Sequence, residues 1–489
     1  MPMSLDESAR LFDQALALQT AGRHEDALPL LDILAARHPD TVEVHRNRAT
    51  ACLALNRLAE ALESLERILV LEPDNLDIRV RIGATLQKLG RNDDARRAYD
   101  DVLIRRPNDA QLLYNISTLL QHEGRLEDAA AFCRRSLAAQ PVQSLANFHL
   151  AVILEELARF DEALEFYTRG IAQAEDPLLR ADMEWNKGVC LLKNGRLEEG
   201  WPLYEARVTR APLPERDKRP VWTGRESLVG KTLLVHAEQG QGDMIQFCRY
   251  LPLAAARGGR IIFSCPQRLL ALLAPLKPWV ELVDEAAPAP AADYQILLMS
   301  LPLALATPVL AESAYLAAEP ARRAAWALRL GPSGFRIGVC WRCDPHNPEK
   351  GRNYPLAALA QIARKPDVRL ISLQHGAGLD QLERLPPGMA VENFDDLDAG
   401  PDGFLDTAAI MAELDLVITC DTATAHLAGA LGRPCWVALP HMPDWRWQLG
   451  REESVWYPSL RLFRQATPGA WTPVFAQMAA ALQDLRARL

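Results

Sequence analysis

The sequence has no apolar segment long enough to cross a membrane. Its most apolar run, residues 296–311, contains Pro302 and Pro308 and is shorter than the roughly 20 residues that a spanning helix needs. Residues 1–7 have neither the basic region nor the apolar core of a secretory signal peptide. We therefore expect a cytoplasmic protein without an integral membrane segment, although peripheral contact with a membrane stays open.

The chain also lacks an excess of basic residues. It has 54 Lys and Arg against 63 Asp and Glu, which gives a net charge of -9. A protein that binds a nucleic-acid backbone would show a clustered basic face, so we expect no nucleic-acid partner. The nine cysteines are scattered, which is typical of reduced, buried thiols and not of a disulfide framework.

Signatures of metal and dinucleotide sites are absent as well. Cys340-Trp341-Arg342-Cys343 has no second pair of zinc ligands. The glycine-rich segment 239–243 lacks the third glycine of a dinucleotide fingerprint. We expect no metal and no cofactor besides a co-substrate.

Residues 5–208 repeat with a period of 34 residues. Small residues recur at one helical position, namely Ala27, Ala61, Ala95, Ala129 and Ala163. Residues suited to a tight turn precede them, namely Gly22, Asn56, Gly90, Gly124 and Ala158. Two antiparallel helices approach closely only where side chains are small, and each unit buries its apolar face on the next. The pattern resembles tetratricopeptide repeats, which implies an all-α superhelix of six repeats that binds a protein or peptide.

A row of mostly polar residues stands two positions before another small residue of each unit. It includes Asn47, Arg81, Asn115, His149 and Asn186. In stacked repeats these side chains would lie along the inner face of the first helices. They are our candidates for binding an acceptor peptide, but the row is equally typical of a solvated face.

Strand and helix patterns alternate from Lys231 onward. After a connector at residues 209–230, we predict an N-terminal Rossmann-like domain at 231–305, which would face the acceptor, and a bridge at 306–334. Residues 335–489 would form a second Rossmann-like domain that binds a nucleotide sugar and ends in a helix. Both domains are expected to be doubly wound parallel sheets, whose ligands bind at the carboxyl ends of the strands.

Two polar corners in these domains carry the functional prediction. Residues 416–419 read as a buried strand, after which Asp421 or Thr422 can cap a helix rich in small residues. The start of such a helix attracts anions, although an ordinary strand-to-helix turn has the same pattern. In the other domain, Asp243 closes the segment 239–243, either as a helix cap or as a reactive carboxylate.

Cations and aromatic residues surround the second corner. Arg342, Lys350 and Arg352 lie on a predicted loop after a strand, where they could neutralise a diphosphate. The aromatic segment 441–457 either contributes to a nucleotide pocket or covers the edge between the domains. The sequence does not separate these two roles.

These corners carry a family resemblance. The segments Gly240-Gln241-Gly242-Asp243 and 421–428 resemble the two signature segments of heptosyltransferase-like glycosyltransferases, glycosyltransferase family 9, which have the GT-B fold of two facing Rossmann-like domains. With its repeats, the chain is similar to bacterial tetratricopeptide-repeat glycosyltransferases and, in layout, to O-linked N-acetylglucosamine transferases.

The resemblance implies specific roles for residues of this chain. Asp243 would be the general base, Asp421 would bind sugar hydroxyls, and Thr422 with Ala423 would hold the diphosphate. His426 would lie beneath them, and Lys350 or Arg352 would be the phosphate cation. The family usually has glycine where Ala423 stands. The predicted donor site also includes Gln239, Gly240, Gly242, Trp341 and Gln374.

The resulting hypothesis is a glycosyltransferase that uses a nucleotide sugar, inverts the sugar and needs no metal. Its acceptor would be a protein held by the repeats, such as flagellin or another surface protein. Two other hypotheses stay open. One is a transferase that acts on a glycan or lipopolysaccharide, and the other is an adaptor with an inactive transferase domain.

Overall fold

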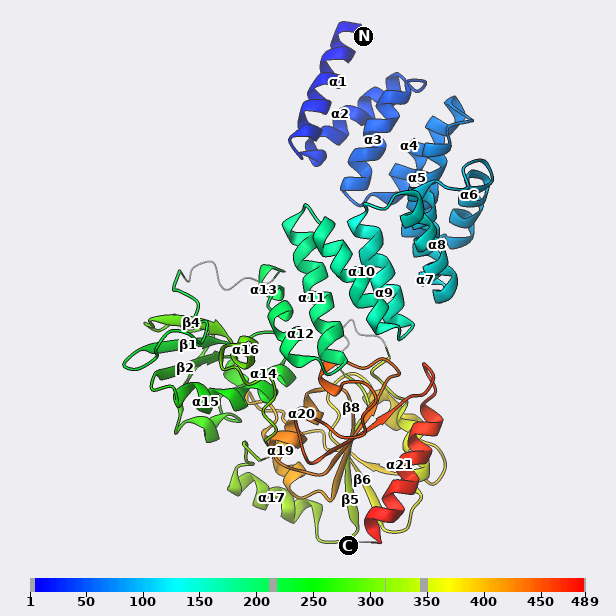
Figure 1. The fold of residues 1–489 in the computed structure, drawn as a ribbon. Helices are drawn as coiled ribbons and strands as arrows, with labels where there is room; N and C mark the ends of the chain where they lie inside the picture. The colour runs from blue at the N-terminus through cyan, green and yellow to red at the C-terminus, as the bar shows by residue number, and fades with distance from the viewer. Residues whose placement is uncertain (1–4, 211–217, 313, 344–350, 488–489) are drawn as a thin grey trace. The chain divides into compact units, whose positions relative to one another are not determined.

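The structure is a computed structural model that describes residues 5–210, 218–312, 314–343 and 351–487. The chain forms two compact units, Met1–Met183 and Glu184–Leu489 (Figure 1). The division falls inside a helix that the periodicity assigns to the sixth repeat. The predicted domain boundary at residues 208 and 209 therefore stays a prediction.

Helices α1 to α12 form six consecutive antiparallel pairs within the described residues. Their bounds are α1 (Leu5–Thr20), α2 (His24–Arg37), α3 (Val42–Ala54), α4 (Leu58–Leu71), α5 (Leu76–Lys88), α6 (Asn92–Arg105), α7 (Ala110–His122), α8 (Leu126–Ala139), α9 (Ser144–Glu156), α10 (Phe160–Gln173), α11 (Pro177–Lys193) and α12 (Leu197–Tyr204). The first unit is all-helical, and the sixth pair lies largely in the second unit.

The recurring small and turn residues explain the pairing. Ala27, Ala61, Ala95, Ala129 and Ala163 are all fully buried, which allows each second helix to approach its neighbours. The turn before each second helix adopts a left-handed conformation, with φ between 56° and 76° at Gly22, Asn56, Gly90, Gly124 and Ala158. Glycine and asparagine tolerate this conformation best. The same backbone turn therefore recurs once in each repeat.

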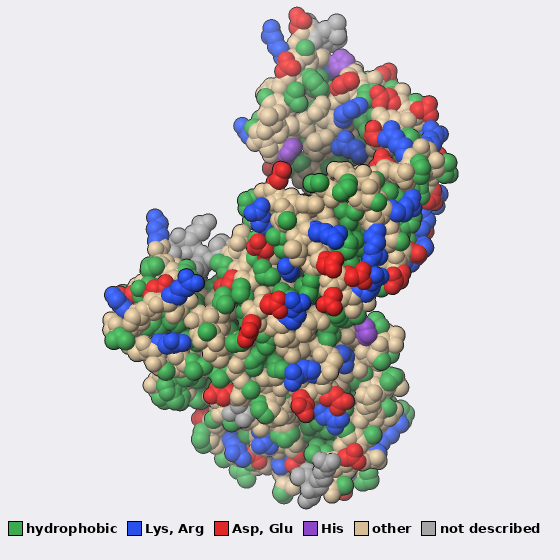
Figure 2. Space-filling view, in the orientation of Figure 1, with side chains coloured by type: hydrophobic (Ala, Val, Ile, Leu, Met, Phe, Trp, Pro, Cys, Tyr) green, Lys and Arg blue, Asp and Glu red, His purple; other side chains and the backbone are tan. Residues whose placement is uncertain are grey.

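The surface of the helix pairs carries both signs of charge. In the face shown in Figure 2, acidic and basic side chains are interspersed over the helix pairs. Several of them form ion pairs between helices, such as Arg48 with Asp32 at 2.7 Å and Arg134 with Glu162 at 3.0 Å. Across the described residues, no helix has the length and hydropathy that a membrane span requires.

The second unit contains two parallel sheets. The first has the strand order β3-β2-β1-β4 and the second has the order β10-β9-β8-β5-β6-β7. The strands are β1 (Thr232–His236), β2 (Arg260–Cys265), β3 (Val280–Asp284), β4 (Tyr294–Leu297), β5 (Phe335–Cys340), β6 (Val368–Ser372), β7 (Val391–Glu392), β8 (Leu416–Cys420), β9 (Cys435–Leu439) and β10 (Leu460–Arg464). Parallel pairing throughout makes the unit an α/β structure.

The remaining helices connect and cover these strands. They are α13 (Arg207–Arg210), α14 (Gln241–Phe247), α15 (Leu251–Ala255), α16 (Leu301–Ala304), α17 (Pro320–Leu330), α18 (Ala360–Ala363), α19 (Leu405–Ala412), α20 (Ala423–Ala430) and α21 (Trp471–Arg486). Successive residues of β8 face opposite layers, because Val417 packs in the core beneath α20 whereas Leu416 and Ile418 pack in the core beneath α21. Helices therefore cover both faces of the larger sheet (Figure 1).

The strand order locates the ligand-binding edge. In the first sheet, β1 lies between β2 and β4, and in the second, β5 lies between β6 and β8. At these strands the chain connections turn to opposite sides, which leaves a crevice beyond the carboxyl ends of the strands. The crevice opens beside the corners that follow β1, β5 and β8.

Three elements differ from what the sequence pattern predicts. The pattern predicts one helix over residues 244–257, but the structure divides it into α14, a 3₁₀ turn at Cys248–Tyr250 and α15, which begins where Pro252 cannot donate a hydrogen bond. Residues 267–276 form two 3₁₀ turns instead of one helix. Strand β10 was not expected, because its sequence gives only a short alternation of apolar and basic residues.

The last helix pair packs into the α/β part of the second unit. Trp201 of α12 is buried and donates its Nε1 hydrogen to the Pro308 carbonyl at 2.9 Å. Arg207 of α13 donates to both carboxylate oxygens of Glu238, at 3.0 and 2.9 Å, and to the Ser300 hydroxyl at 2.8 Å. Burial disfavours the charged guanidinium, but Glu238 and Glu205 outweigh it and raise the pKa of Arg207.

We predict that Arg207→Met destabilises the second unit by about 3–5 kcal/mol, because it leaves Glu238 buried without its cation. All 11 tryptophans lie at position 185 or later, so tryptophan fluorescence during urea unfolding reports on this unit. The matched control is Arg260→Met, which removes the exposed ion pair with Glu281 and should cost at most about 1 kcal/mol. Equal losses in the two variants would contradict the role of Arg207.

Candidate functional site

A cavity of about 1070 Å³ lies at the carboxyl ends of both sheets in the second unit. Its walls come from the corner after β1 at residues 239–244, from the loops after β5 and β6, from the corner at 421–424 and from the loop after β9. The volume is slightly above the usual range for ligand sites, roughly 300–1,000 Å³. Asp243 and Thr422 therefore line the same cavity.

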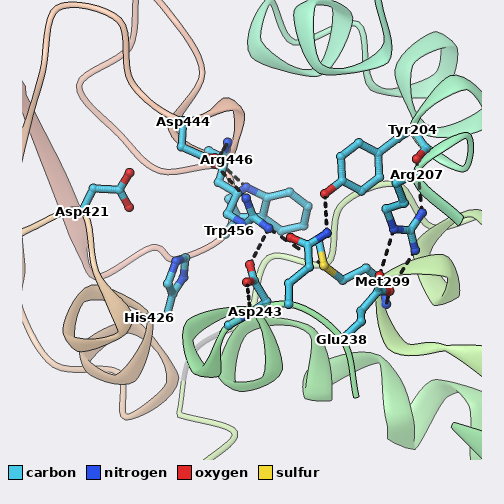
Figure 3. Close-up of polar contacts among 12 residues, drawn as sticks. Tyr204, Arg207, Glu238, Asp243, Met299, Asp421, His426, Asp444, Arg446 and Trp456 are labelled. Atoms are coloured by element: carbon cyan, nitrogen blue, oxygen red, sulfur yellow. Dashed lines mark hydrogen bonds and ion pairs between the residues drawn. The ribbon is translucent and has the colours of Figure 1, made fainter. Parts of the chain in front are cut away.

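Asp243 is the helix cap that its sequence position suggested, and it also lines the cavity. Its Oδ2 accepts a hydrogen bond from the Gly240 amide at 2.9 Å and so closes the first turn of α14. Its Oδ1 forms an ion pair with Arg446 (Figure 3). Burial raises the pKa of Asp243, and the Arg446 cation opposes this shift. The carboxylate is thus a helix cap that also belongs to the cavity wall.

The second corner presents the start of helix α20. Thr422 is the N-cap in extended conformation, and its side chain makes no capping hydrogen bond. The amides of the first turn are therefore not satisfied by that side chain, which is the condition for an anion site at a helix start. Asp421 is buried with 3% exposure and lies 3.4 Å from Arg352, measured from Oδ2 to Nε.

Gly242 allows the two corners to meet. A Cβ atom at this residue would lie 3.1 Å from Cδ2 of His426 and 3.3 Å from Cα of Ala423. Both distances are shorter than ordinary van der Waals contact, so a larger side chain would separate α14 from α20.

His426 lies one turn into α20 and is held as a neutral ring. Its Nδ1 is 3.0 Å from the Tyr457 hydroxyl, and the ring stacks on Trp447 with centroids 5.2 Å apart. Burial and, next, the charge of Arg446 lower the pKa of His426 well below its usual value. His426 can support the corner by packing and hydrogen bonding, but not as a cation.

The loop after β9 adds two charged residues that the sequence did not single out. Arg446 donates to Oδ1 of Asp444 at 2.9 Å, and Arg352 lies 3.4 Å from Oδ2 of the same carboxylate. Burial disfavours the Asp444 carboxylate, but Arg446 and Arg352 lower its pKa to about 2. The only signal for this loop was its place within the aromatic segment 441–457.

These contacts form a continuous row of opposite charges, Asp243–Arg446–Asp444–Arg352–Asp421, which we call the charge row. All five side chains line the cavity, and each is at most 18% exposed. The row contains three carboxylates and two guanidinium groups. Its two ends are the residues that the sequence proposed for proton transfer and sugar binding.

Two residues that were predicted to contact the donor have their polar groups engaged by the protein itself. Trp341 is fully buried in the core beneath α21, where its Nε1 donates to the Gly378 carbonyl at 3.1 Å, so its side chain does not line the cavity. Gln374 does line it, but its amide group is used by the protein. Its Oε1 accepts from two backbone amides, and its Nε2 donates to three carbonyls. Gln374 therefore positions the loops, and Lys350 lies outside the described residues.

The other predicted residues lie at the cavity. Gln239 has a left-handed backbone, with φ of 60°, and its Nε2 donates to the Tyr204 hydroxyl at 3.1 Å. Gly240, Gly242 and Ala423 line the wall. Cys340 and Cys343 also line the cavity as buried free thiols. Among the described residues, no group of three or more His, Cys, Asp or Glu side chains could hold a metal ion.

Comparison with known proteins identifies the helical part of the chain. A family profile described as "Tetratricopeptide repeat" matches residues 12–75, 81–144 and 150–212. The N-terminal region is a tetratricopeptide-repeat array. This result agrees with the 34-residue period and with the six helix pairs, and it supports protein–protein interaction as the role of the region.

A curated relative shares more of the chain. Protein FlbA of Caulobacter vibrioides (strain ATCC 19089 / CIP 103742 / CB 15) is 33% identical over 345 residues, which is 63% of this chain and 56% of FlbA. The chain thus spans just over half the length of that relative. Similar solved structures include MamA from Desulfovibrio magneticus RS-1, with 20% identity, 35% of this chain, 96% of that chain and a TM-score of 0.32. Another is PilW, a type IV pilus biogenesis factor, with 21% identity, 42% of this chain, 95% of that chain and a TM-score of 0.37.

The polar row of the tetratricopeptide repeats is half-buried at every position. Asn47, Arg81, Asn115 and His149 belong to the first unit, and Asn186 belongs to the second. Asn115 accepts a hydrogen bond from Gln111 at 2.9 Å, and His149 contacts the ring of Tyr114 edge-on. Burial lowers the pKa of His149 to about 4, so the ring is neutral near pH 7. Peptide binding by the row stays a prediction.

Asp421 generates a testable pH dependence. Burial raises its pKa from 3.8 to about 6, opposed by Arg352 and reinforced by Asp444. Because the folded state holds this proton more tightly, Asp421 stabilises the fold below pH 4, and this contribution is lost as the pH rises through about 6. We expect that Asp421→Asn, relative to wild type, gains on the order of 3 kcal/mol of stability between pH 4 and pH 7.

Urea unfolding followed by tryptophan fluorescence at both pH values measures this gain. Asp484→Asn, at an exposed position on α21, serves as the control and should show the wild-type pH dependence. A stability difference between Asp421→Asn and wild type that is the same at both pH values would exclude the raised pKa.

Proposed function

We propose that the second unit is a glycosyltransferase that moves a sugar from a nucleotide-sugar donor to a protein acceptor recruited by the tetratricopeptide repeats. The observation that carries the proposal is the position of Asp243 and of the start of α20 on one cavity. A carboxylate on one side and an anion-binding helix start with cations on the other match the two requirements of sugar transfer from a nucleotide.

The donor's diphosphate would bind at the amides of Thr422 and Ala423. Arg352 and Arg446 line the same wall, and guanidinium groups form strong, directional hydrogen bonds with phosphate oxygens. Negative charge accumulates on the diphosphate as the bond to the sugar breaks. Helix amides and two buried cations would stabilise this charge without a metal ion.

Asp243 would receive the proton of the acceptor hydroxyl. As the O–H bond breaks, the acceptor oxygen forms a bond to the anomeric carbon, and the bond from that carbon to the diphosphate oxygen breaks. The nucleoside diphosphate leaves with the electron pair. Attack from the face opposite the leaving group inverts the anomeric centre, and the transition state resembles an oxocarbenium ion. Asp421, which directly precedes the N-cap of α20, would bind sugar hydroxyls.

The repeats would supply the acceptor. Their proposed contact surface is the polar row of the first unit, from Asn47 to His149, which offers donors and acceptors to an extended peptide. The last repeat also contacts the α/β part, because Tyr204 accepts a hydrogen bond from Gln239, beside the corner that carries Asp243. A protein such as flagellin or another surface protein is the acceptor class that we propose.

We expect Asp243→Asn to reduce sugar transfer by about 10²- to 10⁴-fold, the usual contribution of a general base. A thermal-shift screen of nucleotide sugars first identifies the donor, since a ligand that binds the folded state raises the melting temperature. Transfer is then measured as labelled sugar in protein. Asp484→Asn is the matched control, with transfer expected at the wild-type level. Donor binding without transfer in the wild type would favour an adaptor over an enzyme.

The repeat row has its own test. We expect Asn115→Ala/His149→Ala to lower incorporation of labelled sugar into protein of the source organism by roughly tenfold, as expected for the loss of one or two interface contacts. Hydrolysis of the donor by the same variant should not change, because the substitutions lie in the first unit. Arg97→Ala, which removes an exposed arginine from α6, controls for general effects on the array. Unchanged incorporation would remove the row from acceptor binding.

A further inference from the structure

Arg446 connects the two sides of the cavity through charge. Its guanidinium pairs with Asp243 from the first sheet's corner and with Asp444 from its own loop (Figure 3). It also lies 4.5 Å from the ring centre of Trp445. The arginine is 7% exposed and lines the cavity. Arg446 is therefore a buried cation in the cavity wall, and its two ion-pair partners are carboxylates of the protein.

The charge row is incompletely hydrogen-bonded. Nε of Arg446 is buried and has no hydrogen-bond partner within the described residues. Oδ2 of Asp421, likewise buried, makes no hydrogen bond among those residues besides its 3.4 Å ion-pair contact with Arg352. Both side chains are more than nine-tenths buried and line the cavity. A buried donor without an acceptor is costly, so the Arg446 guanidinium points to an anionic ligand, and Asp421 can accept from a hydroxyl of the same ligand.

We propose that a diphosphate anion binds by exchange, in which it replaces Asp243 as the partner of Arg446. Without the anion, Asp243 neutralises Arg446 and is held away from proton transfer. With the anion in place, Asp444 still anchors Arg446, and the Asp243 carboxylate is released to face the acceptor. Identification of the anion as the diphosphate of a nucleotide sugar rests on the proposed function, whereas the exchange itself concerns any diphosphate.

The exchange should change the pKa of Asp243 in a defined direction. Burial raises the pKa of Asp243, and Arg446 is the principal cation that opposes it. The other charged groups that face Asp243 are Asp444 and Glu238, and both raise its pKa further. Loss of the Arg446 contact leaves burial and these two carboxylates opposed by the hydrogen bond from the Gly240 amide but no longer by a cation. The pKa of Asp243 should therefore rise when the anion binds, with partial proton uptake, and the fraction of Asp243 that stays ionised is the stronger base.

A double-mutant cycle tests the exchange with inorganic pyrophosphate as the probe. Binding is measured by titration calorimetry on the full chain for the wild type, Asp243→Asn, Arg446→Met and the double variant. We expect Asp243→Asn to bind pyrophosphate roughly tenfold more tightly, because it removes the internal competitor, and Arg446→Met to bind roughly tenfold more weakly. In the Arg446→Met background, Asp243→Asn should give no gain.

Each contrary result overturns the proposal. A gain from Asp243→Asn that persists without Arg446 would show simple repulsion between the aspartate and the anion. No gain in either background, or no pyrophosphate binding by the wild type, would exclude exchange. The double variant removes one charge of each sign and so preserves the balance that folding requires. Arg446→Gln, which is also uncharged, replaces Arg446→Met in the cycle if the latter does not fold.

Calorimetry in two buffers of different ionisation enthalpy measures the proton. Proton uptake should accompany pyrophosphate binding to the wild type and disappear in Asp243→Asn, and uptake that persists in that variant would assign it to another group. These outcomes are separate from the proposed function. If the protein shows the exchange with pyrophosphate but transfers no sugar, the exchange stands and the proposed enzymatic role does not. If the protein transfers sugar but the double-mutant cycle shows no coupling, the enzymatic role stands and the exchange is excluded.

Discussion

The missing side chain of Gly242 sets the distance between the two corners that form the cavity. At this residue α14 approaches the backbone of α20 so closely that a Cβ atom would lie 3.3 Å from Cα of Ala423. Because the helices meet here, Asp243 and Asp421 lie at opposite ends of one row of ion pairs. The location of the cavity, the burial of its charges and the reach of Arg446 across the two sheets all depend on this contact.

The last tetratricopeptide repeat also forms part of the cavity's support. Tyr204 contacts Trp445 with ring centres 5.4 Å apart and accepts a hydrogen bond from Gln239. Trp445 precedes Arg446, and Gln239 lies in the corner that carries Asp243. The end of α12 therefore contacts both loops that present the Asp243–Arg446 ion pair. Arg207 holds the adjacent Glu238. The sixth repeat is therefore a structural component of the α/β part as well as the end of the array.

Local patterns predicted the elements better than they predicted the contacts of single side chains. The small residues such as Ala61 and Ala129 are buried where the period placed them, because helix packing depends on side-chain size at a fixed spacing. The strands on either side of the corners could be read from short apolar runs. Arg446 and Asp444 could not be found in this way, because Asp243, the partner of Arg446, lies 203 residues away and Arg352, a partner of Asp444, lies 92 residues away. Ion pairing across a fold leaves no local pattern. Trp341 and Gln374 show the same limit, since a residue at a strand end can face the core or use its amide group on its own loops.

The repeating turns have a consequence for how the chain can change over evolution. The left-handed residue recurs from Gly22 to Ala158 with nearly the same φ, so one repeat of the first unit can be lost or duplicated without altering the geometry at which the next begins. Trp201, Tyr204 and Arg207, by contrast, are committed to the loops of the cavity. Partner selection by the earlier repeats and ligand chemistry in the cavity can thus diversify independently, with the sixth repeat as the constrained junction between them.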